Sequence, residues 1–258
     1  MAQEILLDQE YIPFGLAVAA ERDRVGDPEY KFGFNSAVGT SAETIWAQGA
    51  AYTWNSAAQL ELTSTDVDDT DTTGAGARTV TIEGLDANYA AISETVELNG
   101  QTADAGSTTT ASFLRVNRMY VASAGASGVN EGVIYASTGT QTTGTPDDLT
   151  TIRATIAANA GQTLQAIYTV PAGKTMYLYA LHASSAATTG SSQIDFLTSE
   201  NAGPWRTKDR FAVQQGSVTY HFKFPRVFNE KTDMEIQGTA STGTNDVSAS
   251  FEFLLMTP

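Results

Sequence analysis

Short runs in which apolar and polar residues alternate recur along this chain, and they constrain its fold more than any other feature. In "RTVTIEGL" (78–85), Val80 and Ile82 fall on one face of an extended strand, and Thr79 and Thr81 on the other. The run "KTMYLYALHAS" (174–184) alternates in the same way. No long segment has the spacing of an amphipathic helix. The sequence therefore predicts an all-β fold of antiparallel β-sandwich or jelly-roll-like modules.

These runs divide the chain into three regions. Residues 1–60 are expected to form an N-terminal arm that is mostly irregular, with one helical turn at 40–49, where Thr40 and Glu43 have capping-box spacing. Residues 61–158 are expected to form a first β-sandwich region, and residues 159–258 a C-terminal jelly-roll-like β-sandwich. The arm carries Tyr30, Phe32 and Phe34, so we expect it to lie over its own sandwich or a neighbour's. The last run is apolar, which predicts a final strand inside a sheet.

The stretch "TVPAGKT" (169–175) ends like a phosphate-binding loop, G-x-x-x-x-G-K-[ST]. The first glycine of that motif would fall at position 168, which is Tyr168. The loop must also open a helix whose N-terminus holds the phosphates, whereas a strand pattern follows here. The sequence therefore predicts a Pro–Gly turn between two strands, with Lys174 as a turn lysine.

Charge and composition narrow the possible partners. The net charge is −15, which argues against nucleic acid, because such interfaces depend on Lys and Arg. Residues 1–130 hold 18 acidic and 6 basic residues, and residues 131–258 hold 11 and 8. No apolar run approaches the ~20 residues of a membrane span. With no cysteine and no signal-peptide pattern at its start, the chain is expected to be soluble and unexported, with no membrane partner.

Few residues suggest chemistry at a site. The acidic run "STDVDDTDTTG" (64–74) could form a weak Ca²⁺ site, since Ca²⁺ takes several carboxylate oxygens, although its spacing is not that of an EF-hand. A solvated acidic loop is the favoured interpretation. His182 and His221 accompany no G-x-S-x-G motif. We therefore predict no cofactor and no enzymatic activity. The weak Ca²⁺ candidates are Asp66, Asp68, Asp69 and Asp71.

Aromatic and basic residues are the candidates for contact with a partner. Exposed aromatic side chains anchor protein interfaces or stack on sugars, and core packing or subunit contact is favoured here over sugar binding. The segment 205–226 concentrates basic residues, and the run 112–123 is polar on both faces, as expected where a strand meets another subunit. The candidate interface residues are Tyr30, Phe32, Phe34, Trp46, Trp54, Arg115, Arg118, Trp205, Arg206, Lys208, Arg210 and Arg226.

Several phrases of the chain resemble virion structural proteins of tailed bacteriophages, notably those of marine bacteria. They are "GARTVTIEGLDANYAAISETVELNG" (76–100), "SFLRVNRMYVASAGASGVNEG" (112–132) and "AGQTLQAIYTVPAGKT" (160–175), with "NSAVGTSAETIW" (35–46) nearer the N-terminus. The resemblance covers roughly the middle two-thirds of the chain, and it brings no catalytic motif with it.

The resemblance implies a virion component that is assembled in the host bacterial cytoplasm. We expect an outer-capsid decoration or cement subunit, which binds the major capsid protein and its own copies as a homotrimer. A neck or tail accessory protein, or an adhesin that binds host glycans, is the alternative within the virion. A free-standing carbohydrate-active or sugar-binding protein is the alternative outside it, and would be a monomer with a cleft.

Overall fold

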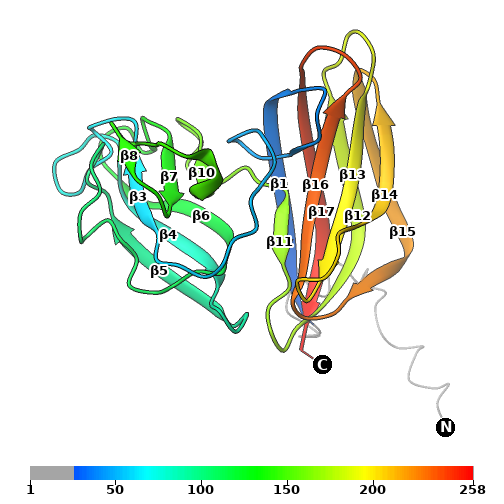
Figure 1. The fold of residues 1–258 in the computed structure, drawn as a ribbon, viewed down its shortest axis with the longest axis horizontal. Coiled ribbons are helices and arrows are strands. Elements are labelled where there is room, and N and C mark those ends of the chain that lie inside the picture. The colour runs from blue at the N-terminus through cyan, green and yellow to red at the C-terminus, as the bar shows by residue number, and fades with distance from the viewer. Residues whose placement is uncertain (1–25, 258) are drawn as a thin grey trace, which may run out of the picture.

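The computed structural model describes residues 26–257, which form two lobes side by side (Figure 1). We call them the jelly-roll lobe, built from β1, β2 and β11–β17, and the insertion lobe, built from β3–β10. Both are antiparallel β-structure, as the alternating sequence predicted, and within residues 26–257 the only helical element is a single 3₁₀ turn, η1 (Leu149–Thr151). No helix among residues 26–257 is long and apolar enough to cross a membrane.

The jelly-roll lobe consists of two sheets packed face to face. One sheet has the order β1-β17-β12-β15, and the other has the order β11-β16-β13-β14, with β2 pairing beside β11 on β16. The final strand β17 lies between β1 and β12, which confirms that it is inside a sheet. The strands are β1 (Asp27–Val38), β2 (Glu43–Thr44), β11 (Ile167–Thr169), β12 (Thr175–Ser185), β13 (Ser192–Glu200), β14 (Arg206–Val213), β15 (Gly216–Phe228), β16 (Thr232–Ala240) and β17 (Asn245–Met256).

The strand order is that of a jelly roll. When β2 and β11 are counted as one interrupted strand, the eight strands in chain order lie as 1-8-3-6 in one sheet and 2-7-4-5 in the other. Alternate residues of the interior strand β17 point into the core. On β17, Val247, Ala249, Phe251 and Phe253 are all buried. Each large apolar side chain buried in this way contributes about 1.5–3 kcal/mol to folding.

The insertion lobe interrupts the strand that β2 and β11 share. The chain leaves the jelly-roll lobe after Ile45 and returns at Ala166, and the two crossings are bonded to each other. The amide of Ala166 donates to the carbonyl of Ile45 at 2.9 Å, and that of Ala47 to Leu164 at 3.0 Å. Such adjacent ends are typical of a domain inserted into another.

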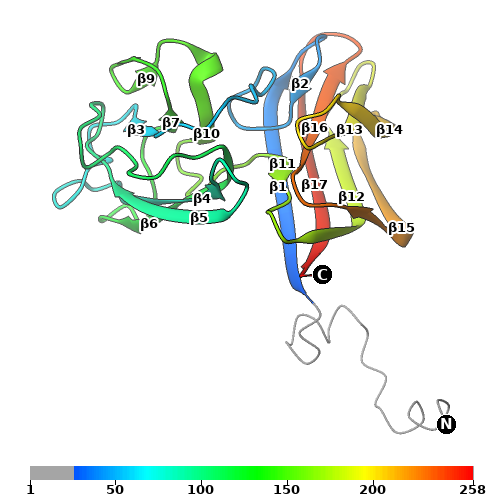
Figure 2. The ribbon, with the colours of Figure 1, turned by 60° about the horizontal axis from the view of Figure 1, so that its bottom comes forward.

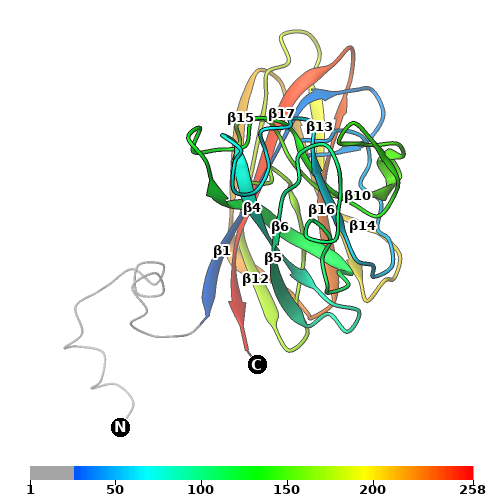
Figure 3. The same ribbon diagram turned by 90° about the vertical axis from the view of Figure 1, so that its left-hand side faces the viewer.

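The insertion lobe packs small sheets around its own core. Its sheets have the orders β5-β4-β6 and β10-β7-β3, with β8 pairing β9. Figure 3 shows β4, β5 and β6 side by side. Leu60, Ile82, Phe113 and Met119 are among its fully buried side chains. The strands are β3 (Glu61–Ser64), β4 (Ala77–Leu85), β5 (Ala91–Glu97), β6 (Arg115–Ala124), β7 (Ile134–Ser137), β8 (Gln141–Thr142), β9 (Thr145–Pro146) and β10 (Ile152–Ile156).

The predicted irregular arm is wrong over residues 27–38, because β1 is a 12-residue strand paired with β17. Its core-facing side carries small and polar residues. A Cβ at Gly33 would overlap the backbone of Ile45 and Ala166, so only glycine fits between these crossing segments. Residues 1–25 of the arm lie outside the described residues.

The helical turn predicted at 40–49 is also absent. Glu43 and Thr44 form β2 on β16, and the Glu43 carboxylate accepts from the amide of Gly39 at 3.1 Å and the side chain of Asn35 at 3.0 Å. Pairing with the distant strand β16 therefore determines the structure of this segment, and the local capping-box spacing does not produce a helical turn.

Residues 171–174 form the predicted turn. The amide of Lys174 donates to the carbonyl of Pro171 at 3.2 Å, and Gly173 has φ +73°, which favours glycine. The strand β12 follows directly. The Lys174 ammonium lies 3.5 Å from the carboxylate of Asp27, so this lysine pairs with the start of β1.

Candidate functional site

A buried ion pair joins the two lobes. Arg115 on β6 donates through Nε and Nη2 to the carboxylate of Asp233 on β16, at 2.8 and 3.0 Å, and both side chains are over 90% buried. Its Nη1 donates to the carbonyls of Asn55 and Leu114, and its guanidinium lies 5.0 Å from the ring of Trp54. The bidentate geometry fixes the orientation of the lobes at this point.

A neutral set of hydrogen bonds extends the same junction. The side chain of Asn117 accepts from the backbone amide of Thr169 at 3.0 Å and donates to the backbone carbonyl of Thr169 at 3.2 Å. It therefore bonds both backbone groups of one residue, as the backbone of a paired strand does. Gln165 donates to the carbonyl of Val116 at 2.9 Å. The polar face of β6 therefore binds the jelly-roll lobe of the same chain.

Glu235 lies buried beside this junction and pairs with no base among the described residues. Its carboxylate accepts from Thr44 at 2.6 Å, from the indole of Trp54 at 3.0 Å and from Gln237 at 2.7 Å. Burial raises the pKa of Glu235 above its ordinary value. These donors hold the carboxylate in place and make Trp54 part of the junction.

Residues of both lobes line a cleft of about 1100 Å³. Its walls come from β1, β4–β6 and the turn at 171–174, on the side where the lobes face each other (Figure 2). Lys31 is 7% exposed there and donates to the carbonyl of Asn117. Burial lowers the pKa of Lys31 to about 8.

The contacts above correct three predictions. Arg115 is buried inside the chain, and Trp46 is only 2% exposed, packed edge-on at 5.1 Å from the ring of Tyr52. Neither side chain is available to a partner. The polar strand 112–123 meets the second lobe of its own chain rather than another subunit.

The outer strand β15 carries three exposed large apolar side chains, and one of them, Phe224, is the most exposed large apolar side chain of the described residues. Phe224 is 77% exposed, Val227 55% and Tyr220 47%. The pairing of β15 with β12 jumps from Ala180–His221 to Leu178–Arg226, so the four residues between them bulge out of the sheet. We call Tyr220, Lys223, Phe224 and Val227 the aromatic–basic edge; it lies on the side of the lobe away from the insertion lobe (Figure 1).

Acids neutralise part of the basic segment 205–226. Arg226 lies 2.6 Å from Asp209, Arg210 lies 2.6 Å from Asp195, and Lys208 lies 3.8 Å from Glu200. Arg206 and Lys223 are exposed and form no ion pair within residues 26–257. Trp205 is 38% exposed, 5.1 Å from Trp54.

The arm aromatics lie on the outer face of the sheet that contains β1. Tyr30 is 56% exposed and Phe32 37%, and both border a hollow of about 260 Å³, while Phe34 is half-buried. His182 on β12 contacts both neighbouring strands on this face, since its Nδ1 lies 3.1 Å from the hydroxyl of Thr219 and its Nε2 lies 3.3 Å from the carboxylate of Glu252. Arg118, on β6, is exposed and stacks 4.6 Å from the ring of Tyr120.

The acidic loop between β3 and β4 does not gather the four predicted aspartates. Asp69 is fully buried and accepts from the hydroxyl of Ser64 and from the amides of Ala77, Glu131 and Gly132 at 2.6–2.9 Å. Asp71 is not part of the cluster either.

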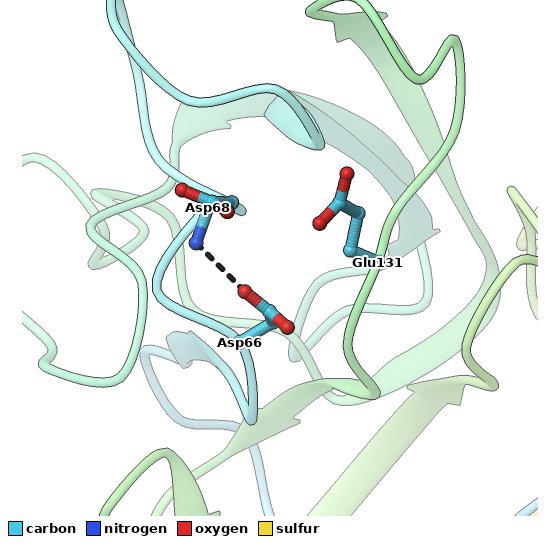
Figure 4. Close-up of side chains that lie close together, drawn as sticks. All are labelled: Asp66, Asp68 and Glu131. Carbon is cyan, nitrogen blue, oxygen red and sulfur yellow. Dashed lines mark hydrogen bonds between the residues drawn. The ribbon is translucent and has the colours of Figure 1, made fainter.

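Glu131 takes their place. Carboxylate oxygens of Asp66, Asp68 and Glu131 lie within 4.8 Å of one another (Figure 4). The amide of Asp68 donates to Asp66 at 2.9 Å, which shapes the loop. Exposed acids often gather without a metal ion, so the cluster alone assigns no Ca²⁺ site. Sequence reasoning missed Glu131, which is 63 residues from Asp68 and has no local signal.

Comparison with known proteins gives little. No protein-family model and no curated protein matches the chain. Among solved structures, those of infectious bursal disease virus strains Gt and Gx are similar at 12% and 11% identity, covering 95% and 89% of this chain and 77% and 72% of theirs. Their TM-scores are 0.23 and 0.24, so this likeness carries no argument about function.

Proposed function

We propose that this chain is a non-enzymatic structural protein of a tailed-bacteriophage virion, and that it decorates the outer capsid. In this role it binds the major capsid protein and its own copies, as a homotrimer. The observation that carries the proposal is the aromatic–basic edge. Three large apolar side chains, each about half exposed or more, lie on one outer strand with Lys223, which forms no ion pair within residues 26–257. Exposed apolar side chains gathered on one outer strand are typical of a protein-binding face.

The resemblance of phrases such as 76–100 and 160–175 to phage virion proteins supports the same proposal. The lobe junction supports it too. Arg115 and Asn117 join the lobes through polar bonds to Asp233 and Thr169, so both lobes present their outer surfaces in a fixed arrangement. A subunit that must meet a regular lattice needs that rigidity.

Sugar binding is a weaker candidate on this structure. The indole of Trp54 donates a hydrogen bond to Glu235 and packs beside Arg115, so its interactions are with the junction between the lobes. Trp205 is then the exposed aromatic of that cluster, and one indole gives a small platform for a sugar ring. A glycan array that binds the wild type and loses binding with Trp205→Ala would favour the adhesin.

The test is to separate heads from tails in purified particles and to detect this chain by mass spectrometry. The proposal predicts the chain in the head fraction, in a fixed ratio to the major capsid protein. Detection only in tails would overturn the capsid role and favour the neck or tail alternative. Absence from both fractions would overturn a virion role altogether.

A further inference from the structure

We propose that the aromatic–basic edge of one copy binds an acidic tip on the insertion lobe of the next copy. The acidic tip is defined as Asp66, Val67, Asp68 and Glu131. This inference rests on the self-association proposed above and names the two surfaces that form it.

The two surfaces have opposite charge and the same mixed character. On the tip, Val67 is 62% exposed between two aspartates, with Glu131 close by. On the edge, Phe224 is 77% exposed beside Lys223, whose ammonium lies 5.7 Å from its ring. Val67 among acidic side chains can pack against Phe224 beside a basic side chain, because the apolar groups then meet each other and the opposite charges face each other.

Neither charged surface forms an ion pair within the part of the chain that the structure describes. Within residues 26–257, no base forms an ion pair with the three tip carboxylates, although they crowd within 4.8 Å. Like charges this close repel one another, so a cation from a partner relieves the repulsion. Lys223, and Arg206 on the adjoining strand β14, are exposed bases that can supply it.

The tip is held in a fixed shape before binding. The buried Asp69 anchors the loop through four hydrogen bonds, and a Cβ at Gly100 would lie 3.1 Å from the carbonyl oxygen of Val67, so the loop packs closely on its neighbour. A preformed loop loses little conformational freedom when a partner docks.

Recognition at the edge occurs through side chains rather than by strand addition. The bulge, Lys223 and Pro225 together block a second strand from pairing along this part of β15. The edge lies on the side of the jelly-roll lobe away from the insertion lobe, while the tip belongs to the insertion lobe (Figure 1). One chain therefore cannot join its own two surfaces, and the contact runs head to tail between copies. The trimer closes if each contact turns the next copy by about 120°.

The experiment exchanges the charges. Full-length wild type, Lys223→Glu, Asp68→Lys and the combined Lys223→Glu/Asp68→Lys variant are compared by size-exclusion chromatography with light scattering over a concentration series. Asp246→Lys, an exposed acid on the jelly-roll lobe, is the control with the same change of net charge as Asp68→Lys. The side chains of Lys223, Asp68 and Asp246 are exposed, so circular dichroism should show that each variant folds like the wild type.

We expect each single exchange to weaken association at least about tenfold, since like charges then face each other. The combined variant should associate again like the wild type, and Asp246→Lys should not change. Single variants that associate like the wild type would overturn this contact and leave self-association standing. A combined variant no better than either single one would also overturn it. A wild type that stays monomeric would overturn the homotrimer as well, while the particle fractionation still decides the capsid role. Loss of capsid binding with Lys223→Glu alone, and unchanged self-association, would assign the edge to the capsid lattice instead.

Discussion

Arg115 is the side chain whose removal tests the two-lobe arrangement most severely. In Arg115→Met, Asp233 stays buried and keeps a hydrogen bond from Thr169 at 2.6 Å, but it loses both charged donors. Removing one partner of a buried pair costs about 3–5 kcal/mol, because the remaining charge is uncompensated. For a chain of this size each kcal/mol lowers Tm by roughly 2–4 °C, so we expect a fall of about 6–20 °C.

The assay is thermal unfolding followed by near-UV circular dichroism. Arg210→Met is the matched control, since Arg210 makes the same bidentate contact with Asp195 but is 58% exposed. Solvent screens that pair, so its Tm should stay close to the wild type. Adding Asp233→Asn to Arg115→Met should recover part of the loss. Equal Tm values for Arg115→Met and Arg210→Met would refute the assigned role of the junction.

Three further predictions concern single sites. Lys31 has a folded-state pKa of about 8 against an ordinary 10.5, so between these pH values the unfolded chain binds one more proton than the folded chain, and the stability of the fold rises with pH. Between pH 7.5 and 10.5, the Tm of the wild type should therefore rise more than the Tm of Lys31→Met. Parallel curves of Tm against pH would contradict this. Gly33→Ala should lower Tm much more than Gly173→Ala, whose Cβ meets nothing within 4 Å and which bears only the cost of its positive φ, about 1 kcal/mol. Asp69→Asn should destabilise the fold by about 2–4 kcal/mol in urea unfolding, because the NH₂ of the new amide then faces backbone N–H donors. Asp68→Asn, at an exposed position, should leave the stability unchanged. Equal urea midpoints for the two variants would contradict this.

The regular strands were predictable because their periodicity follows burial. In β17, apolar residues at every second position are part of the core of the jelly-roll lobe, and in β12 the same alternation changes phase once, at the irregularity between Leu178 and Ala180. In β1 the pattern is inverted. Tyr30 and Phe32 point outward, while Lys31 and Gly33 are buried against other segments of the chain. Alternation was present in the sequence, but the crowded inner face demands small or polar residues there, which disguised the strand.

The junction could not be predicted for a different reason. Arg115 and Asp233 are 118 residues apart, and each resembles an ordinary surface charge in its own segment. Only the insertion of one lobe into a strand of the other brings them together. The same holds for the acidic tip, where Glu131 joins the loop from β3 to β4. Exposed charges and buried ones of the same type differ by tertiary contacts that local sequence does not contain.

The most direct measurement of the proposed function is a reconstruction of the assembled particle by electron cryomicroscopy, with this two-lobed chain fitted into the density. The proposal predicts density for the chain on the outer capsid surface, repeated with the lattice, with the β15 edge of each copy in contact with a neighbouring protein. A capsid surface without this density, or density for the chain only in the neck or tail, would contradict it.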